Sequence, residues 1–114
     1  MSAARYNLII DQGTDFALEF IVKESGTAKN LSGYNARAQL RPTKDSSTLT
    51  ETFTCTLQDG SVTGKIKAAL TSSETSAVSA GRYFYDLELF TTGGTAIVTR
   101  LLEGTVTITQ EVTR

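Results

Sequence analysis

Residues 81–90 read Gly-Arg-Tyr-Phe-Tyr-Asp-Leu-Glu-Leu-Phe, and this stretch carries the plainest structural signal in the chain. Every second position is apolar and falls on one face: Tyr83, Tyr85, Leu87 and Leu89. The positions between them form the other face: Phe84, Asp86, Glu88 and Phe90. Successive side chains of a strand point to opposite sides, so this alternation predicts a strand with one face in a core and the other toward solvent.

The same period of two recurs on both sides of this stretch, in residues 15–23, 34–41, 52–57 and 62–70. Pro42 closes the second of these segments, because proline cannot donate a hydrogen bond to a β ladder. Asp59-Gly60 is a tight-turn signal between the last two. The sequence therefore predicts four further strands, of which the last two form a hairpin.

The remaining elements lie between these strands and at the ends of the chain. Residues 6–10 predict a first strand, and a Thr-Gly-Gly-Thr loop at 92–95 leads to strands at 96–102 and 106–112. Gly104 interrupts the last segment, as glycine does at a bulge or bend. Thr71-Ser72-Ser73-Glu74 has the spacing of a capping box and predicts one short helical turn near Ser72 to Val78.

About seven short strands with turn signals every 8 to 12 residues are typical of an immunoglobulin-like antiparallel β-sandwich. The antiparallel arrangement follows from the alternation, because parallel sheets show continuous apolar runs and helical crossovers. Tyr83 follows Gly81 at the entry to its strand, where such sandwiches place a corner tyrosine; the alternative is an ordinary core aromatic.

At 114 residues the chain has room for one domain. We expect an N-terminal arm at residues 1–5 and a single immunoglobulin-like domain at 6–114. The predicted core consists of Phe16, Leu18, Phe20, Ala38, Leu40, Leu57, Ile66, Tyr85, Leu87, Val106 and Ile108.

Composition excludes several classes of function. The 11 basic and 12 acidic residues are interspersed, with a net charge of -1, so we expect no nucleic acid as a partner. The chain has no histidine, which removes the commonest general base and metal ligand, and its one cysteine cannot form an internal disulfide. The apolar stretch at 8–10 is too short for a secretory or membrane segment, which indicates synthesis in the cytoplasm without membrane association.

Two acidic pairs are candidate sites. Asp11 and Asp15 flank a glycine, but they lack the dense oxygen ligands of a calcium loop, so we interpret this segment as a turn. Asp86 and Glu88 share a strand face, and catalysis would need a cleft that separates their environments.

The economical account of Asp86 and Glu88 is cross-strand ion pairing with basic residues at outward positions. These are Arg37, Arg41, Arg82 and Arg100. Cys55 shares a face with Phe53 and Leu57, which favours a small buried hydrophobe over a nucleophile. We therefore expect no enzyme activity, catalytic residue, metal, cofactor or small-molecule substrate.

The candidate interaction residues lie at the N-terminus and on one sheet face. Strands 6–10 and 106–112 are expected at sheet edges, which can recruit a partner by strand addition. Phe84 and Phe90 point outward and favour a protein interface, unless the domain itself covers them. The candidate interface consists of Met1, Ser2, Ala3, Ala4, Arg5, Tyr6, Phe84 and Phe90.

Four strings of residues carry a resemblance to a known family. They read YNLIIDQGTDF at 6–16, NLSGY at 30–34, AGRYFYDLE at 80–88 and VTRLLEG at 98–104. In these strings the sequence resembles small virion proteins of tailed bacteriophages that have an immunoglobulin-like fold. It is more loosely similar to the amino-terminal domain of baseplate upper proteins.

The resemblance implies a non-enzymatic structural subunit of the virion, in the tail, the baseplate or the attachment of a fibre. It would be synthesised in the host cytoplasm and would bind other virion proteins in a symmetric assembly. Capsid decoration and a module that binds the host surface or a glycan are the alternatives.

Overall fold

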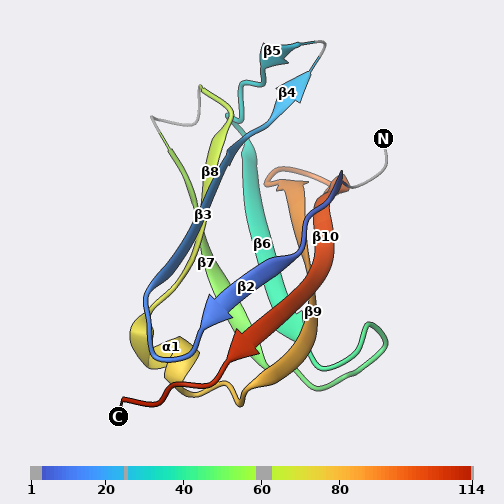
Figure 1. Cartoon of the computed structure of the whole chain (residues 1–114). Helices are drawn as coiled ribbons and strands as arrows, with labels where there is room; N and C mark the ends of the chain where they lie inside the picture. The colour runs from blue at the N-terminus through green and yellow to red at the C-terminus, as the bar shows by residue number, and fades with distance from the viewer. Residues whose placement is uncertain (1–3, 25, 59–62, 114) are drawn as a thin grey trace.

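The computed structural model describes residues 4–24, 26–58 and 63–113, and it is predominantly β, as the sequence predicts (Figure 1). The described residues form these elements: β1 (Ala4–Arg5), β2 (Leu8–Asp11), β3 (Phe16–Ile21), β4 (Lys23–Glu24), β5 (Thr27–Ala28), β6 (Tyr34–Arg41), β7 (Glu51–Leu57), β8 (Lys65–Leu70), α1 (Ser72–Ser76), β9 (Gly81–Thr91) and β10 (Val98–Thr109). Three of the ten strands have only two residues. The seven longer strands match the predicted number of about seven strands.

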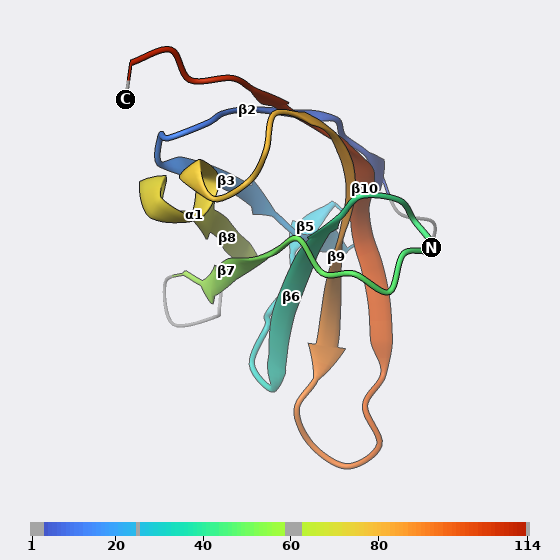
Figure 2. The same ribbon diagram turned by 90° about the horizontal axis from the view of Figure 1, so that it is seen from below.

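The strands form two facing layers that share one strand. β2, β10, β9 and β6 make one layer, and β3 and β8 make the other. β7 belongs to both, because its first half pairs with β6 and its second half with β8. Figure 2 shows the two layers facing each other with β7 at the junction. The predicted sandwich is confirmed.

The N-terminal strands depart from the predicted antiparallel arrangement. β1 and β2 both pair with β10 in the parallel direction, from Ala4 beside Leu102 to Asp11 beside Thr109. All the other pairings are antiparallel among the described residues. Alternation reports which face of a strand is buried, and it does not report the direction of the neighbouring strand. The sheet that contains β10 is therefore mixed.

β10 is also longer and more central than expected. The predicted strands at 96–102 and 106–112 are one continuous strand, with β9 on one side and β1 and β2 on the other. The expectation that residues 106–112 form an edge is therefore wrong. The register shift predicted at Gly104 lies instead between Arg100 and Leu102, and Gly104 pairs regularly with Tyr85.

Two local predictions are confirmed at the lower end of the molecule in Figure 1. Thr71 caps α1, with its hydroxyl accepting from the Glu74 amide while the Glu74 carboxylate accepts from the Thr71 amide. Tyr83 is a corner tyrosine, because its hydroxyl donates to the Ser79 carbonyl oxygen at 2.7 Å, four residues upstream. β7 and β8 form the predicted antiparallel hairpin, although its Asp59-Gly60 turn lies outside the described residues.

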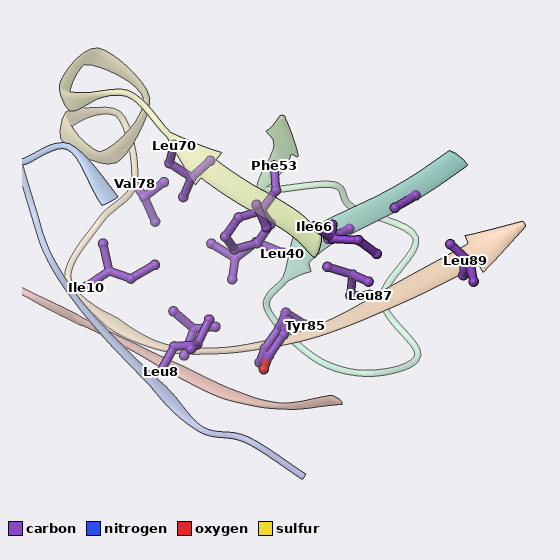
Figure 3. Close-up of a cluster of buried hydrophobic side chains, with 14 of the residues drawn as sticks. Leu8, Ile10, Leu40, Phe53, Ile66, Leu70, Val78, Tyr85, Leu87 and Leu89 are labelled. Atoms are coloured by element: carbon purple, nitrogen blue, oxygen red, sulfur yellow. The ribbon is translucent and has the colours of Figure 1, made fainter. Parts of the chain in front are cut away.

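The core lies between the two layers, where side chains from both meet (Figure 3). Most of the predicted core residues are buried, and four are half-buried: Phe16, Leu18, Phe20 and Leu57. The first three lie on β3, which among the described strands pairs with β8 alone and is therefore less covered than an interior strand. Further buried residues lie outside the predicted core list: Leu8, Ile10, Val22, Leu31, Ala36, Phe53, Ala68, Leu70, Val78 and Leu89.

Leu87 tests the packing of this core. The side chain is 1% exposed, so Leu87→Ala removes buried methyl groups and leaves a cavity, which should lower the free energy of unfolding by about 2 to 5 kcal/mol. Ile9→Ala is the control, because Ile9 is 71% exposed and its loss should change stability by less than about 0.5 kcal/mol. Urea denaturation of both variants measures the difference. Similar losses in the two variants would contradict this description of the core.

Candidate functional site

The N-terminal segment is docked along β10. Ala4 and Arg5 pair with Leu102 and Glu103, and the Tyr6 amide donates to the Glu103 carbonyl oxygen at 2.9 Å. Ala4 and Arg5 are exposed, and Tyr6 is 51% exposed. The candidate residues Met1, Ser2 and Ala3 lie outside the described residues.

Gly104 and Tyr85 fix the path of this segment over β10. A Cβ at position 104 would lie 2.5 Å from the Tyr6 carbonyl oxygen and 2.8 Å from Asn7 Oδ1, so only glycine allows the backbones this approach. The Tyr85 hydroxyl donates to the Tyr6 carbonyl oxygen at 2.5 Å, and the Thr105 amide donates to Asn7 Oδ1 at 3.0 Å. Burial, with a contribution from Tyr6, raises the pKa of Tyr85 to about 12, so this hydroxyl remains a donor at neutral pH.

Phe84 and Phe90 lie on the solvent-facing side of the β6, β9 and β10 sheet, which we call the outer face. Cross-strand register places Glu88 between Arg37 and Arg100, and Asp86 between Gln39 and Glu103. The outer face consists of Arg37, Gln39, Arg41, Phe84, Asp86, Glu88, Phe90, Arg100 and Glu103. Charged residues therefore occupy its middle, and one phenylalanine lies toward each end.

Ion pairs cross the strands of the outer face, as predicted for two of the four arginines. Arg37 Nε lies 2.8 Å from Glu88 Oε1, and Arg100 lies 3.4 Å from Asp86 and 3.3 Å from Glu103. Arg100 thus lies within ion-pair distance of two carboxylates that are directly opposite each other.

The prediction is wrong for the other two arginines. Arg41 donates to Gln39 Oε1 and to the Ser46 carbonyl oxygen, and Arg82 makes no ion pair with any residue in the described part of the chain. Gly81 and Arg82 lie beside the end of β10, where Ile108 and Thr107 are their partners. No carboxylate is therefore in register with Arg82.

The environment of Asp86 disfavours its charge. Desolvation raises the pKa of Asp86 above its ordinary value, the neighbouring Glu88 carboxylate adds to the rise, and Arg100 opposes it. Two carboxylates opposite each other on paired strands repel, so this face holds charge at some cost to stability.

The two phenylalanines are half-buried, and basic groups of the same chain lie over them. Arg37 lies 4.8 Å from the centre of the Phe90 ring, and Lys44 Nζ lies 5.9 Å from the centre of the Phe84 ring. Lys44 belongs to the β6–β7 connection, which forms one wall of a concavity of about 340 Å³ over Phe84, Asp86 and Glu103. The domain thus covers part of each ring and leaves the remainder open.

The Asp11 to Asp15 segment is a turn, as interpreted. Asp11 accepts from the Thr109 hydroxyl, and Asp15 accepts from the Ser72 amide, so the two carboxylates have separate partners. Gln12 joins the turn to the α1–β9 connection and to the segment after β10, by donating to the Val78 carbonyl oxygen and accepting from the Glu111 amide. No group of three potential metal ligands occurs among the described residues.

Cys55 is half-buried and packs against the core. Desolvation raises the pKa of the Cys55 thiol to about 11, so very little thiolate is present at neutral pH. The residue behaves as a small hydrophobe, as the sequence predicts. In the part of the chain that the structure describes, no helix is long and apolar enough to cross a membrane.

Comparisons with known proteins support the fold alone. No protein-family model matches the sequence, and no curated protein does either. One similar chain comes from the structure described as "Structural basis of T cell specificity and activation by the bacterial superantigen toxic shock syndrome toxin-1". It has a TM-score of 0.51 and 15% identity, with 92% of both chains covered.

A second similar chain comes from "Ab initio phasing of a nucleoside hydrolase-related hypothetical protein from Saccharophagus degradans that is associated with carbohydrate metabolism". Its TM-score is 0.39 at 13% identity, and the match covers 92% of this chain and 22% of that one. A score this low carries no argument about fold or function.

Gly104→Ala tests the docking of the N-terminal strand. The added methyl group would force the backbone at Tyr6 away from β10, so we expect a loss of about 1 to 3 kcal/mol in the free energy of unfolding. Gly93→Ala is the matched control, because a Cβ there meets no atom within 4 Å. Urea denaturation measures both, and equal effects would show that the approach at Gly104 is not constrained.

Asp86→Asn tests the electrostatics of the outer face. A raised carboxyl pKa means that the folded state binds the proton more tightly, so the contribution of Asp86 to stability falls as pH rises through its titration. Between about pH 3 and pH 7 the unmodified protein should therefore lose stability relative to Asp86→Asn. The side chain is 41% exposed, so the difference should be small. Urea denaturation at both pH values checks its sign, and the opposite sign would contradict the account.

Proposed function

We propose that this protein is a non-enzymatic structural subunit of a tailed-bacteriophage virion, in the tail, the baseplate or the attachment of a fibre. It acts through contacts with other virion proteins in a symmetric assembly. The observation that carries the proposal is the set of four sequence strings that resemble small virion proteins of immunoglobulin-like fold.

Three of the four strings contain residues that hold the first strand of the domain in place. Residues 6–16 contain β2 and its turn, residues 80–88 contain Tyr85, and residues 98–104 end at Gly104. Tyr85 and Gly104 are the residues that fix the path of Tyr6 over β10. The resemblance therefore extends to residues with a joint structural task, which supports a shared fold beyond isolated turn glycines.

The chemistry of the outer face supports a protein partner. Aromatic residues and arginine are enriched at protein interfaces, and the outer face combines two phenylalanines with Arg37, Arg41 and Arg100. Charges of both signs lie side by side there, so the face offers no uniformly positive surface to a polyanion. Complementary contacts with a folded protein suit this pattern.

Two alternatives remain as outcomes of the test. Capsid decoration would use the same kind of protein contact at another place in the particle. A glycan site would use an aromatic ring beside carboxylates, and Phe84 with Asp86 has that composition. However, Lys44 lies over the Phe84 ring and Arg100 lies close to Asp86, so a sugar would have to displace groups that the chain itself supplies. A protein contact is therefore the better-supported reading.

Deleting residues 1–5 tests the proposed role. Leu8 and Ile10 remain buried without this segment, so the truncated domain should stay folded, with little change in melting temperature. Its incorporation into particles should fall, because Ala4 and Arg5 are exposed beside β10 and would contact a neighbouring subunit there. Quantitative mass spectrometry of purified virions measures the copy number. Ile97→Ser is the control, since Ile97 is 69% exposed in the β9–β10 connection and lies outside the deleted segment.

One result would reject the proposal, and a second would exclude the N-terminal contact. Virions that contain none of the unmodified protein would exclude a structural subunit of the particle. Normal incorporation of the folded, truncated protein would exclude the N-terminal contact, while leaving the outer face to be tested with Phe84→Ala.

A further inference from the structure

The strand β3 has one side without a partner. It pairs with β8, and no other strand among the described residues pairs with it. In an immunoglobulin sandwich of the constant type, the first strand lies in the same sheet as the second. Here β1 and β2 pair with β10 in the other layer, and in Figure 1 β2 and β3 meet beside α1 and then separate. The position of the first strand therefore leaves the edge of β3 bare.

This edge lacks the usual protection against strand pairing. Exposed edges are normally blunted by proline, bulges, several charges or a very short strand. β3 is six residues long, contains no proline and pairs with β8 in an unbroken register. Glu19 is its one charged residue, while Phe16, Leu18 and Phe20 face the core and remain half-buried.

The hydrogen bonds of β3 show which backbone groups point to the free side. The Val22 amide donates to the Gly64 carbonyl oxygen at 2.7 Å, on the side of β8. Backbone groups of antiparallel strands point to alternate sides from one residue to the next, so Phe20 and Leu18 share the direction of Val22. The N–H and C=O groups of Ala17, Glu19 and Ile21 therefore point to the free edge.

We propose that β3 pairs with β3 of a second copy of this chain, antiparallel and centred on Leu18, so that two sandwiches share one continuous sheet. In this register Ala17 lies opposite Glu19 of the second copy, and both have backbone groups that point to the shared edge. Leu18 lies opposite itself, and Phe16 lies opposite Phe20 on the core side.

Charge and side-chain complementarity select this register. Sliding one strand by two residues in one direction places Glu19 opposite Glu19 of the second copy. Sliding it by two residues in the other direction places Glu19 opposite Asp15 of the second copy. Both bring like charges together, which destabilises a strand pair. The register centred on Leu18 avoids this contact and brings two pairs of phenylalanines together, which are favourable cross-strand partners. It also covers the half-buried side chains of β3 in both copies.

The pairing has two-fold symmetry and closes on itself, as in most homodimers. It uses the edge of the β3 and β8 layer and leaves the outer face of the other layer free. It depends on the edge of β3 alone and not on the proposed place in a virion, so the two proposals fail independently.

Paired substitutions at Ala17 test both the dimer and its register. Ala17 is exposed and lies opposite Ala69 in its own sheet, so a longer polar side chain there should not disturb the core. Ala17→Glu places a second carboxylate opposite Glu19 at two symmetric sites, and should raise the dimer dissociation constant roughly three- to tenfold. Ala17→Lys, which matches it in size, should lower the constant by a similar factor.

Sedimentation velocity over a range of concentrations measures these constants. The unmodified protein should show a reversible equilibrium between monomer and dimer. A protein that stays monomeric up to its solubility limit would overturn the proposal. So would a dimer that responds equally to both substitutions, because that dimer would use another surface.

Cross-linking provides a second test, independent of affinity. Residues opposite each other in a non-hydrogen-bonded antiparallel pair have Cα atoms about 4.5 Å apart, within the range of a disulfide. With Cys55→Ser as background, Leu18→Cys should form a covalent dimer when oxidised glutathione accepts the electrons. Phe20→Cys is the matched control and should not, because it lies opposite Phe16 and far from its own counterpart. Equal cross-linking of the two variants would contradict the register.

Discussion

The parallel pairing of the first strand with β10 determines the rest of this structure. It requires the Tyr6 backbone to pass directly over β10, which only a glycine at position 104 permits, and the Tyr85 hydroxyl fastens it there. Leu8 and Ile10 then close the core from that side. The same pairing removes the first strand from the neighbourhood of β3, so among the described strands β2 ends one layer and β3 ends the other, each with one unpaired side.

Periodicity predicted the elements that depend on side-chain burial. The alternation of residues 81–90 identified β9 and its buried face, the capping box identified α1, and the position of Tyr83 identified the corner. Each of these is encoded locally. The direction of the first strand is not, because Leu8-Ile9-Ile10 has no clear alternation and its partner lies about a hundred residues further along the chain.

Gly104 is a constrained position, as the sequence indicates, but the constraint is a close backbone approach and not a bulge. Glycine within a strand marks either a bulge or a close approach of another backbone. The sequence does not show which segment will approach, so it predicts a bulge. The actual shift occurs between Arg100 and Leu102, where the residues carry no signal of a bulge.

The contacts of the outer face could also be predicted only in part. The alternation places Arg37 and Arg100 on the same sheet face as Asp86 and Glu88, so ion pairs between these groups could be anticipated. The choice of Asp86 by Arg100 could not, because the register places Arg100 opposite Glu88. The position of Lys44 over Phe84 could not, because the β6–β7 connection has no periodic pattern. That contact matters for function, since it decides how much of the phenylalanine ring a partner can reach.

Amide hydrogen exchange along β3 tests the central claim most directly, namely that the first strand leaves this edge unpaired. In dilute solution the amides of Ala17, Glu19 and Ile21 should exchange quickly, whereas those of Leu18 and Phe20 should be protected by β8. Raising the protein concentration should slow the exchange of the first group and leave the second unchanged. Equal protection of both groups in dilute monomer would contradict the account, because it would mean that another segment of the chain already pairs with β3.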